Sequence, residues 1–557
     1  MRPLRCLAGA LWFLLAPVAA AAATATSVSP PTVVPQYRVF DLLLTNSNTS
    51  VTNKFTGVWL NATFAPPPSA SGPAAPRAFW GFHDGGDVWH LRYMPDIVGQ
   101  WAYTWRFSDG SLAGRGSFDC VATGAGKGVI QVYTANPHWF AYNGITPVFL
   151  KSYYNKAGGL TRQDPTWAIA NFYQKLVDHG YNHHMSSGFL PVLPLAAQWD
   201  GQPVLDGPPA INRTIYTDPS SPSTSMSLDV WQALEAQLGF LNDHDIAVDF
   251  FQGFQAQGPD SGRIQFGSLT EDAKRWWVSY VVARLAPFAN IAGWVYSWET
   301  GGDGDDLHLA KLLRELDPFG HLTTYEDADA IAGNWYNLSD WGFASVETYG
   351  GVASHHNMSL QAYRGKPVYM AEGHMLWHSF WEASERVIVS AAWAVTTAAA
   401  SFSWDDMGVS RITGPYRASQ AFSQYPSAVK SMDILADVMV NQTKAFHKLV
   451  PADELLGPPC VAAPDQVLPP LTFCMAEKGQ QYLVYSDSGQ GFSLDTRPVE
   501  TGARGGGGSG APVQYSIAWV DAVGGARVEG VAVAAGVVAL TPPSNKTHWV
   551  ALLQAVH

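Results

Sequence analysis

Two glutamates each close an apolar run that the sequence predicts to be a β-strand. Glu299 follows residues 291–298, Glu372 ends residues 367–372, and no lysine or arginine lies beside either. Because burying an unpaired carboxylate is costly, a chain that places two of them at such positions usually uses them. A converging pair suits hydrolysis of a glycosidic bond, in which one carboxyl protonates the leaving oxygen and the other attacks the anomeric carbon or activates water. The alternative for either glutamate is an ion-paired residue of the core.

Eight strand-like runs alternate with amphipathic, helix-like stretches between about residues 137 and 445. This alternation is typical of an α/β fold, the (β/α)₈ TIM barrel, whose active site lies where the loops after the strands converge. Glu299 and Glu372 would end the fourth and seventh strands, so we expect both side chains at one mouth. The eight predicted strands are residues 147–153, 181–186, 246–251, 291–298, 322–326, 342–348, 367–372 and 399–404.

Six further residues near the strand ends are predicted to contact a substrate. For Tyr349 and Trp404 simple packing is an equal alternative, and Glu347 is either a sugar contact or the partner of a barrel cation. His183 and His184 are adjacent in a strand and point to opposite faces, so they do not bind one metal together. No glycine-rich phosphate loop follows a strand, and we expect neither a metal nor a cofactor. The six predicted contacts are Trp298, Tyr349, Trp404, His184, Glu347 and His374.

Two β-rich segments flank the predicted barrel. Residues 36–134 contain short alternating strands separated by turns rich in glycine, proline and aspartate, which is typical of a β-sandwich. Residues 446–557 predict a second, smaller sandwich. The predicted fold is therefore a TIM barrel over residues 137–445 with an all-β domain on each side.

The composition and the first residues predict an exported protein. A net charge of −13 disfavours nucleic acid and anionic lipid as partners. Residues 1–25 have the charged, apolar, small-residue order of a signal peptide, so we expect a secreted or cell wall-associated protein. Residues 387–404 are apolar enough to imitate a membrane span, but their serines, threonines and following aspartates favour a buried helix and strand. The oligomeric state stays open.

Export also predicts two kinds of covalent modification. Cys460 and Cys474 lie in one loop-rich stretch and are predicted to form a disulfide, whereas Cys120 would be a buried free thiol. Sequences of the Asn-x-Ser/Thr type predict N-glycosylation. They occur at Asn48, Asn61, Asn212, Asn337, Asn357, Asn441 and Asn545.

Several motifs resemble a known family of glycan-degrading enzymes. Short motifs of the first 144 residues are similar to a sandwich domain of unknown function and to the first strand of the barrel that it precedes. These motifs are FHDGG at 82–86, LRYMPD at 91–96, GQWAY at 99–103, GSFDC at 116–120 and HWFAYNG at 138–144. Residues 481–485, 519–521 and 549–553 resemble a collagen-binding-like domain that follows such barrels. The whole arrangement resembles the apiosidase-like and cellulase-like barrels of the clan A retaining glycoside hydrolases.

The resemblance implies roles for individual residues. Glu299 would be the acid/base and Glu372 the nucleophile of a retaining reaction on a polysaccharide or glycan. We expect Glu299 to stay protonated beside the negative charge of Glu372. Tyr349 would hydrogen-bond the nucleophile, and Trp404 would stack under the sugar ring.

Two positions differ from the clan's pattern. Trp298 stands where the clan has an asparagine before the acid/base glutamate, and Asn182-His183-His184 replaces the strand-two arginine. These differences leave both carboxylates in place. They keep open an alternative function, a catalytically degenerate carbohydrate-binding or extracellular matrix protein.

Overall fold

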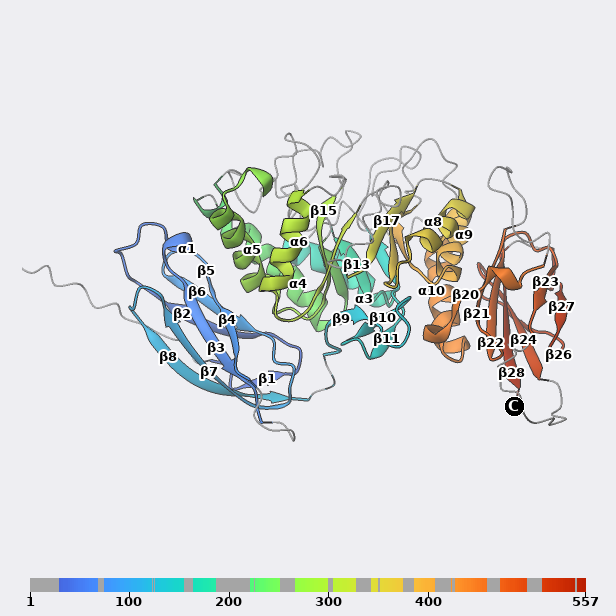
Figure 1. The fold of residues 1–557 in the computed structure, drawn as a ribbon, viewed down its shortest axis with the longest axis horizontal. Coiled ribbons are helices and arrows are strands. Elements are labelled where there is room, and N and C mark those ends of the chain that lie inside the picture. The colour runs from blue at the N-terminus through green and yellow to red at the C-terminus, as the bar shows by residue number, and fades with distance from the viewer. Residues whose placement is uncertain are drawn as a thin grey trace, which may run out of the picture.

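The computed structural model places an eight-stranded barrel between two β domains (Figure 1). It describes residues 30–556 except 69–74, 123, 125, 155–163, 187–220, 225, 251–265, 299–303, 327–341, 349–350, 374–384, 406–421, 423–425, 458–470, 498–512 and 546–547. For residues 186, 296–298, 304–306, 372–373, 385–386 and 405 it describes the backbone only.

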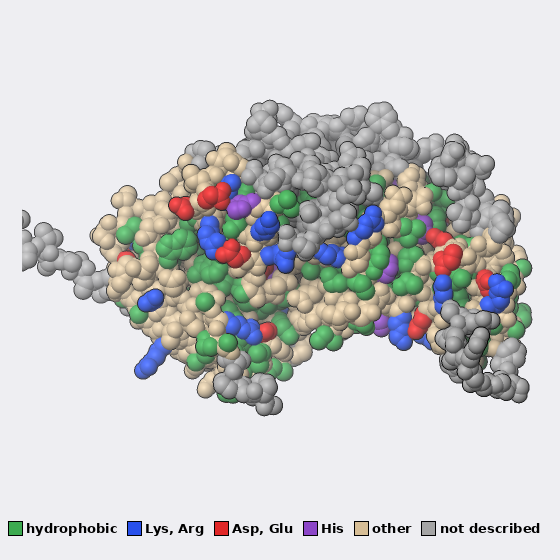
Figure 2. Space-filling view, viewed as in Figure 1, with side chains coloured by type: hydrophobic (Ala, Val, Ile, Leu, Met, Phe, Trp, Pro, Cys, Tyr) green, Lys and Arg blue, Asp and Glu red, His purple; other side chains and the backbone are tan. Residues whose placement is uncertain are grey.

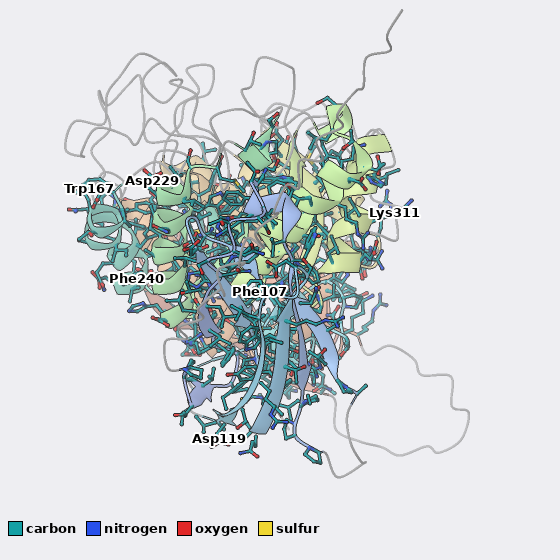
Figure 3. All side chains as sticks on the ribbon, turned by 90° about the vertical axis from the view of Figure 1, so that its left-hand side faces the viewer. Phe107, Asp119, Trp167, Asp229, Phe240 and Lys311 are labelled. Atoms are coloured by element: carbon teal, nitrogen blue, oxygen red, sulfur yellow. The ribbon has the colours of Figure 1, made fainter. Side chains whose placement is uncertain are left out.

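Two sheets make up the N-terminal domain, in the orders β1-β8-β7-β3-β4 and β2-β6-β5. Alternating side chains form their buried faces, as in β3, where Leu60, Ala62 and Phe64 are buried. Figure 3 views the molecule from this domain, with Asp119 at its lower end and Phe107 nearer the centre. The bounds are β1 Val33–Pro35, β2 Phe40–Thr45, β3 Leu60–Ala65, β4 Arg77–Trp80, β5 Phe82–His83, β6 Val88–Tyr93, β7 Gly99–Phe107 and β8 Ala113–Val121, with the short helix α1 at Lys54–Gly57.

Eight parallel strands, β12 to β19, close into a barrel, which confirms the predicted fold class. Each of the eight strands overlaps one of the runs predicted from the sequence, although the first run begins five residues before β12. Two strands, β15 and β16, have the predicted bounds. The barrel strands are β12 Ser152–Tyr154, β13 His183–Ser186, β14 Ala247–Phe250, β15 Ile291–Trp298, β16 Leu322–Glu326, β17 Ala344–Thr348, β18 Val368–Gly373 and β19 Ser401–Asp405.

Helices that follow the strands cover the outside of the barrel. Thr270 caps α5 by accepting a hydrogen bond from the backbone N–H of Ala273, as helix starts favour. The apolar stretch 387–404 forms most of α9 and β19, and in the described part of the chain no helix is long and apolar enough to cross a membrane. The helices are α2 Pro165–Ala168, which continues through a π-helical turn Ile169–Tyr173 into α3 Gln174–Asp178, then α4 Leu228–Asp243, α5 Glu271–Leu285, α6 Gly304–Leu316, α8 Val352–Ala362, α9 Glu385–Thr397 and α10 Pro426–Asp437.

A small three-stranded sheet closes the amino-terminal end of the barrel. Its strands are β9 Ile130–Val132, β10 Phe140–Tyr142 and β11 Thr146–Val148, in the order β11-β10-β9. The apolar side chains of this sheet and the inward-facing residues of the barrel form one buried cluster. The Phe140 and Phe343 rings, for example, pack edge to face with centroids 5.6 Å apart.

The C-terminal domain packs against helices α8 and α9 of the barrel (Figure 1). His356 Nε2 of α8 lies 2.6 Å from Asp453 Oδ2, and the Trp393 ring of α9 stacks on Tyr485 with centroids 5.8 Å apart. The strands of this domain are β20 Val450–Pro451, β21 Thr472–Glu477, β22 Gln481–Ser486, β23 Phe492–Asp495, β24 Gln514–Asp521, β25 Arg527–Glu529, β26 Val533–Ala534, β27 Val537–Leu540 and β28 Trp549–Val556.

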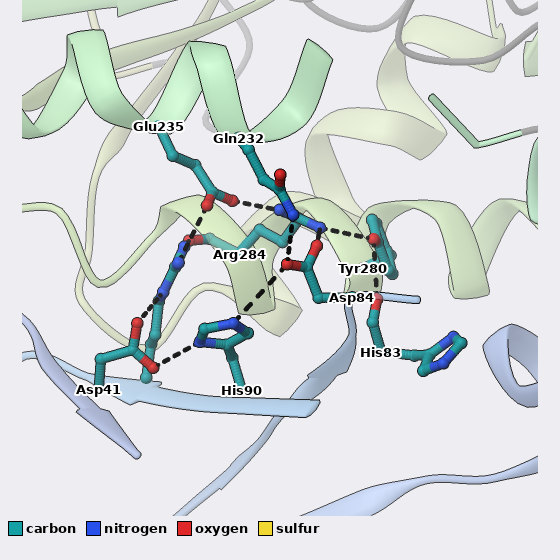
Figure 4. Close-up of polar contacts among 9 residues, drawn as sticks. Asp41, His83, Asp84, His90, Gln232, Glu235, Tyr280 and Arg284 are labelled. Atoms are coloured by element: carbon teal, nitrogen blue, oxygen red, sulfur yellow. Dashed lines mark hydrogen bonds and ion pairs between the residues drawn. The ribbon is translucent and has the colours of Figure 1, made fainter. Parts of the chain in front are cut away.

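Buried charges join the N-terminal domain to the barrel (Figure 4). Arg284 of α5 is fully buried, and its Nη1 donates to Asp84 Oδ1 at 2.7 Å and to the Tyr280 hydroxyl at 2.8 Å. Its Nε donates to Glu235 Oε1 of α4. A buried guanidinium is therefore held by acidic groups from both domains, as the burial of a charge requires.

Arg92 of β6 completes this interdomain network. Its Nη2 donates to Glu235 Oε2 at 2.9 Å, its Nε to Asp41 Oδ2 at 2.9 Å, and its Nη1 to the backbone carbonyl of Arg284 at 3.0 Å. His90 Nδ1 lies 2.8 Å from the other Asp41 oxygen. The contacts fix the position of the N-terminal domain beside α4 and α5.

Candidate active site

The mouth of the barrel lies at the carboxyl ends of its strands, where the two predicted catalytic carboxylates belong. In the parallel ladder, Glu372 of β18 pairs with Glu347 of β17, and Trp298 at the end of β15 pairs with Glu326 of β16. Glu299 follows Trp298 directly in the sequence. The predicted residues outside the described part of the chain are Glu299, Tyr349 and His374, and for Trp298 and Glu372 the backbone alone is described.

Strand pairing is irregular close to these residues. Val346 pairs with Met370, but the next residue, Glu347, pairs with Glu372, so Ala371 is an extra residue of β18. β15 has a comparable shift before its last residue. Bulges of this kind bend a strand and change the direction in which the following residues project, and they occur often beside active sites.

Three buried carboxylates of the described residues point into the barrel. Asp249, Glu326 and Glu347 are each at most 2% exposed. Each follows a residue that belongs to the core outside the barrel wall, and because side chains alternate along a strand, each carboxylate takes the inner face. These preceding residues are Val248, Tyr325 and Val346.

Two of the three carboxylates were missed by the sequence predictions. Glu347 was predicted to be a site residue, and the structure places it, buried, near the end of β17. Asp249 lies inside an apolar run, where nothing in the sequence marks it. Glu326 ends the fifth predicted strand just as Glu372 ends the seventh, so the same reasoning could have identified it as a candidate. Within the described residues, no three His, Cys, Asp or Glu side chains are arranged to hold a metal ion.

A chain of polar contacts crosses the lumen below the mouth. Ser152 Oγ lies 2.8 Å from His183 Nδ1, 2.8 Å from the Tyr369 hydroxyl and 3.3 Å from Ser403 Oγ. On its other side, His183 Nε2 lies 3.3 Å from Asp249 Oδ2. These side chains form one polar layer that joins β12 to β13, β14, β18 and β19. Its member in β18 is Tyr369, which lies three residues before Glu372.

Gly293 of β15 makes room for this layer. A Cβ atom at that position would lie 2.8 Å from Asp249 Oδ1 and 2.7 Å from Cε1 of Phe343, closer than side-chain atoms approach. Asp249 Oδ1 itself is buried and has no hydrogen-bond partner among the residues that the structure describes. A buried carboxylate oxygen without a partner is uncommon in folded proteins.

His184 does not lie at the predicted substrate site. Its neighbour His183 points into the barrel, so His184 points to the helices, where its ring packs edge-on against Phe172 and Tyr173 with centroids 5.5 and 5.7 Å away. It is fully buried, and burial lowers its pKa to about 3, which keeps the imidazole neutral. The prediction of a sugar contact at His184 is therefore wrong.

Trp404 also faces away from the lumen. Ser403, which precedes it, reaches Ser152 inside the barrel, so Trp404 takes the outer face of β19. Its ring is fully buried and packs against Tyr153 and Phe422, with centroids 5.1 and 6.1 Å away. Of the two predicted alternatives, the structure has the packing residue and not the sugar platform.

The two described cysteines are free and buried. Burial raises the pKa of Cys120 to about 11 and holds the pKa of Cys474 well above its usual range. Cys474 lies inside β21, where it pairs with Val484 and its side chain belongs to the core of the C-terminal domain. A free thiol there contradicts the predicted disulfide with Cys460, a residue outside the described part.

Most of the described glycosylation sequences have an accessible asparagine. Asn48 is half-buried, and its Nδ2 donates to Asp109 Oδ2 at 2.9 Å, which a glycan would disturb. Asn212 and Asn337 lie outside the described residues. The exposed asparagines are Asn61, Asn357, Asn441 and Asn545.

Comparisons with known proteins agree with this architecture. The domain of unknown function DUF5060 matches residues 33–108, and no curated protein matches the chain. Crystal structures of a candidate glycoside hydrolase and of a family 5 glycoside hydrolase, both from Bacteroides vulgatus, superpose with TM-scores of 0.69 and 0.57. The first structure has 16% sequence identity and covers 94% of this chain and 100% of its own chain. The second has 14% sequence identity and covers 77% of this chain and 94% of its own chain. Another glycoside hydrolase superposes with a TM-score of 0.58, at 12% sequence identity over 77% of this chain and 97% of its own chain. The chain therefore has the barrel fold of glycoside hydrolases, with β domains at both ends.

Proposed function

We propose that this protein is a secreted glycoside hydrolase that cleaves O-glycosidic bonds of a polysaccharide or glycan with retention of configuration. Glu372 is the nucleophile and Glu299 the acid/base. The observation that carries the proposal is the position of Glu372 in the ladder, paired with the buried, inward-facing Glu347 at the mouth of a glycoside hydrolase barrel.

The extra residue in β18 supports this assignment. Simple alternation from Met370, which belongs to the core outside the barrel, would put Glu372 on the outer face. The pairing skips Ala371, however, and residues paired across parallel strands share a face. Glu372 would therefore share the inner face with Glu347. A bulge at this point of the strand changes the face that the following residues take.

The reaction would proceed in two displacements. The Glu372 carboxylate attacks the anomeric carbon as the bond to the leaving oxygen breaks, and Glu299 gives its proton to that oxygen. Glu299, now ionised, then takes a proton from water, and the water oxygen displaces Glu372 from the anomeric carbon. The product keeps the configuration of the substrate, and both carboxyl groups return to their first states.

The surface fits a neutral, extracellular substrate. Charged side chains are few, at 14% of the sequence, and Figure 2 shows them singly or in small groups on the displayed face. Four predicted glycosylation sites are exposed. Both features favour a protein that acts outside the cell on glycans.

The test is Glu372→Ala assayed on a panel of cell-wall and algal glycans, with and without azide. We expect the variant to lose turnover and azide to restore it, with a glycosyl azide of inverted configuration as the product, because azide replaces the missing nucleophile. Glu299→Ala should retain activity on substrates with a good leaving group. Glu315→Gln, a change at an exposed ion pair with Arg275, is the control and should act as the wild type.

Other outcomes would overturn the assignment. Full activity of Glu372→Ala would exclude Glu372 as the nucleophile, and an inverted sugar product from the wild type would exclude retention. Binding of glycans without any turnover by the wild type would favour the degenerate carbohydrate-binding protein instead.

A further inference from the structure

Trp59 is the only exposed tryptophan among the residues that the structure describes, with 38% of its surface accessible. It directly precedes β3, and its backbone N–H donates to Ser108 Oγ at 2.8 Å, so the sheet fixes its position. One exposed apolar side chain needs no special explanation by itself. This ring, however, lines a pocket.

The pocket has a volume of about 320 Å³ and lies between the N-terminal domain and the first turns of α5. Besides Trp59, its lining residues include Trp276, Asp272, Thr56 and Ser223. We call it the junction pocket. Ligand sites are typically concave, about 300–1,000 Å³ in volume, and combine apolar walls with a few polar groups. A second pocket of about 490 Å³ shares Ser223 with it.

Hydrogen bonds between the segments hold the junction pocket open. Trp276 Nε1 donates to the Phe55 carbonyl of α1 at 2.6 Å. Asn53 Nδ2 donates to the Ser223 carbonyl at 3.4 Å, which ties the turn Pro222–Thr224 to the N-terminal domain. Because both walls are fixed, the pocket is preformed and binding would cost little ordering.

The charge of the junction pocket points to a neutral, hydroxyl-rich ligand. Asp272 is exposed, and no lysine or arginine of the described residues pairs with it. Its neighbour Glu271 is already engaged by Lys274 at 3.0 Å and His308 at 2.9 Å. An unpaired carboxylate accepts strong hydrogen bonds from hydroxyl groups and repels anions. An aromatic ring beside it offers a flat face to the C–H groups of a sugar.

The junction pocket lies on the mouth side of the barrel. α5 follows β14 in the sequence, so its first turn lies at the end where the strands finish. Figure 1 shows α1 beside this end of α5. A glycan that reaches the mouth can therefore extend over the rim toward Trp59.

We propose that the junction pocket is a second sugar-binding site, which holds a neutral sugar unit of the same glycan that is cleaved at the mouth. The sugar stacks on Trp59, and its hydroxyls donate to Asp272. The inference rests on the proposed glycosidase function for the identity of the glycan, whereas the binding itself can be tested without turnover.

Affinity electrophoresis of the full chain in gels with soluble mixed-linkage β-glucan, xylan or galactomannan tests the proposal. At least one neutral polysaccharide should retard the wild type, and the dissociation constant should rise about tenfold in Trp59→Ala. Asp272→Asn should weaken binding as well, and Trp59→Tyr should fall between wild type and alanine. Asp243→Asn, at an exposed aspartate that ends α4, is the charge control and should bind as the wild type. Polygalacturonate should retard none of them.

Two further measurements separate this site from the catalytic centre. Hydrolysis of a small aryl glycoside should be unchanged in Trp59→Ala, because such a substrate occupies the mouth alone, and the melting temperature should also be unchanged. Binding that depends on Trp59 in a chain without turnover would support the pocket and overturn the proposed function. Three results would each overturn the sugar-binding role of the junction pocket. In the first, Trp59→Ala and Asp272→Asn migrate through the glycan gels as the wild type does, and in the second, no glycan retards the wild type. In the third, the wild type is a dimer that Trp59→Ala dissociates.

Discussion

Arg92 of the N-terminal domain donates to Glu235 of barrel helix α4 at 2.9 Å, in a site where both side chains are at most 10% exposed. Glu235 also accepts from Arg284, so one carboxylate bridges two guanidinium groups from different domains. Removing one member of a buried ionic network leaves the others charged and unpaired, which costs far more than the intact network contributes. The N-terminal domain is therefore expected to unfold together with the barrel.

We predict that Glu235→Gln lowers the free energy of unfolding by roughly 3–5 kcal/mol, because Arg92 and Arg284 lose their shared counter-ion. Chemical denaturation followed by fluorescence would measure it. Glu315→Gln removes a carboxylate from an exposed pair with Arg275 and is the matched control, for which we expect a much smaller loss. Equal losses in both variants would contradict a special role for the buried network.

The same network predicts sensitivity to acid. Burial alone would raise the pKa of Glu235, but the charges of Arg284 and Arg92 lower it below its ordinary value of 4.5. The Glu235 carboxylate therefore binds a proton more readily in the unfolded chain than in the folded protein. The stabilisation that ionised Glu235 provides is complete above its ordinary pKa and is lost as the pH falls through its pKa in the folded protein. Between about pH 5 and pH 3 the wild type should therefore lose stability more steeply than Glu235→Gln. Parallel curves for the two proteins would refute this linkage.

Tyr369→Phe tests the polar layer below the mouth. The change removes a hydroxyl that lies 2.8 Å from Ser152 Oγ and should lower stability by about 1 kcal/mol. Because Tyr369 belongs to the strand that carries Glu372, kcat should fall as well. Tyr485→Phe removes a buried hydroxyl in the C-terminal domain, 2.8 Å from His548 Nδ1, and should affect stability alone. Unchanged kcat in Tyr369→Phe would show that the layer does not position the site.

Trp404→Phe distinguishes the packing residue from a sugar platform. Loss of part of a fully buried ring should reduce the free energy of unfolding by roughly 0.5–3 kcal/mol, with KM for the glycan unchanged. Trp393→Phe, at another fully buried tryptophan, should behave in the same way. A raised KM with normal stability in Trp404→Phe would mean that the ring does contact the substrate.

The order of the barrel strands could be predicted from the sequence because strand-like runs alternate with helix-like stretches. Since these strands are buried on both faces, the sequence pattern does not show which of their side chains face inward. His184 was assigned to the wrong face for this reason, and the two alternatives for Trp404 could not be distinguished. Knowledge of one inward-facing residue, such as Ser152, would have shown which of its neighbours in the strand face inward and which face outward.

Contacts between distant segments could not be predicted. Residues 147–153 read as one strand, but the structure divides them between β11 at the base and β12 in the wall. The pairing of Glu372 with Glu347 depends on the extra residue Ala371, which no local pattern marks. Arg92 and Glu235, 143 residues apart, are brought together by the packing of two domains.

The sheet β9–β11 gives the barrel a blind end. Phe140 and its apolar neighbours fill this end, so the described part of the barrel is a packed core and not a channel. A ligand of the polar groups at the strand ends would therefore approach from the mouth side. In the proposed reaction, substrate and product would then share that side of the molecule.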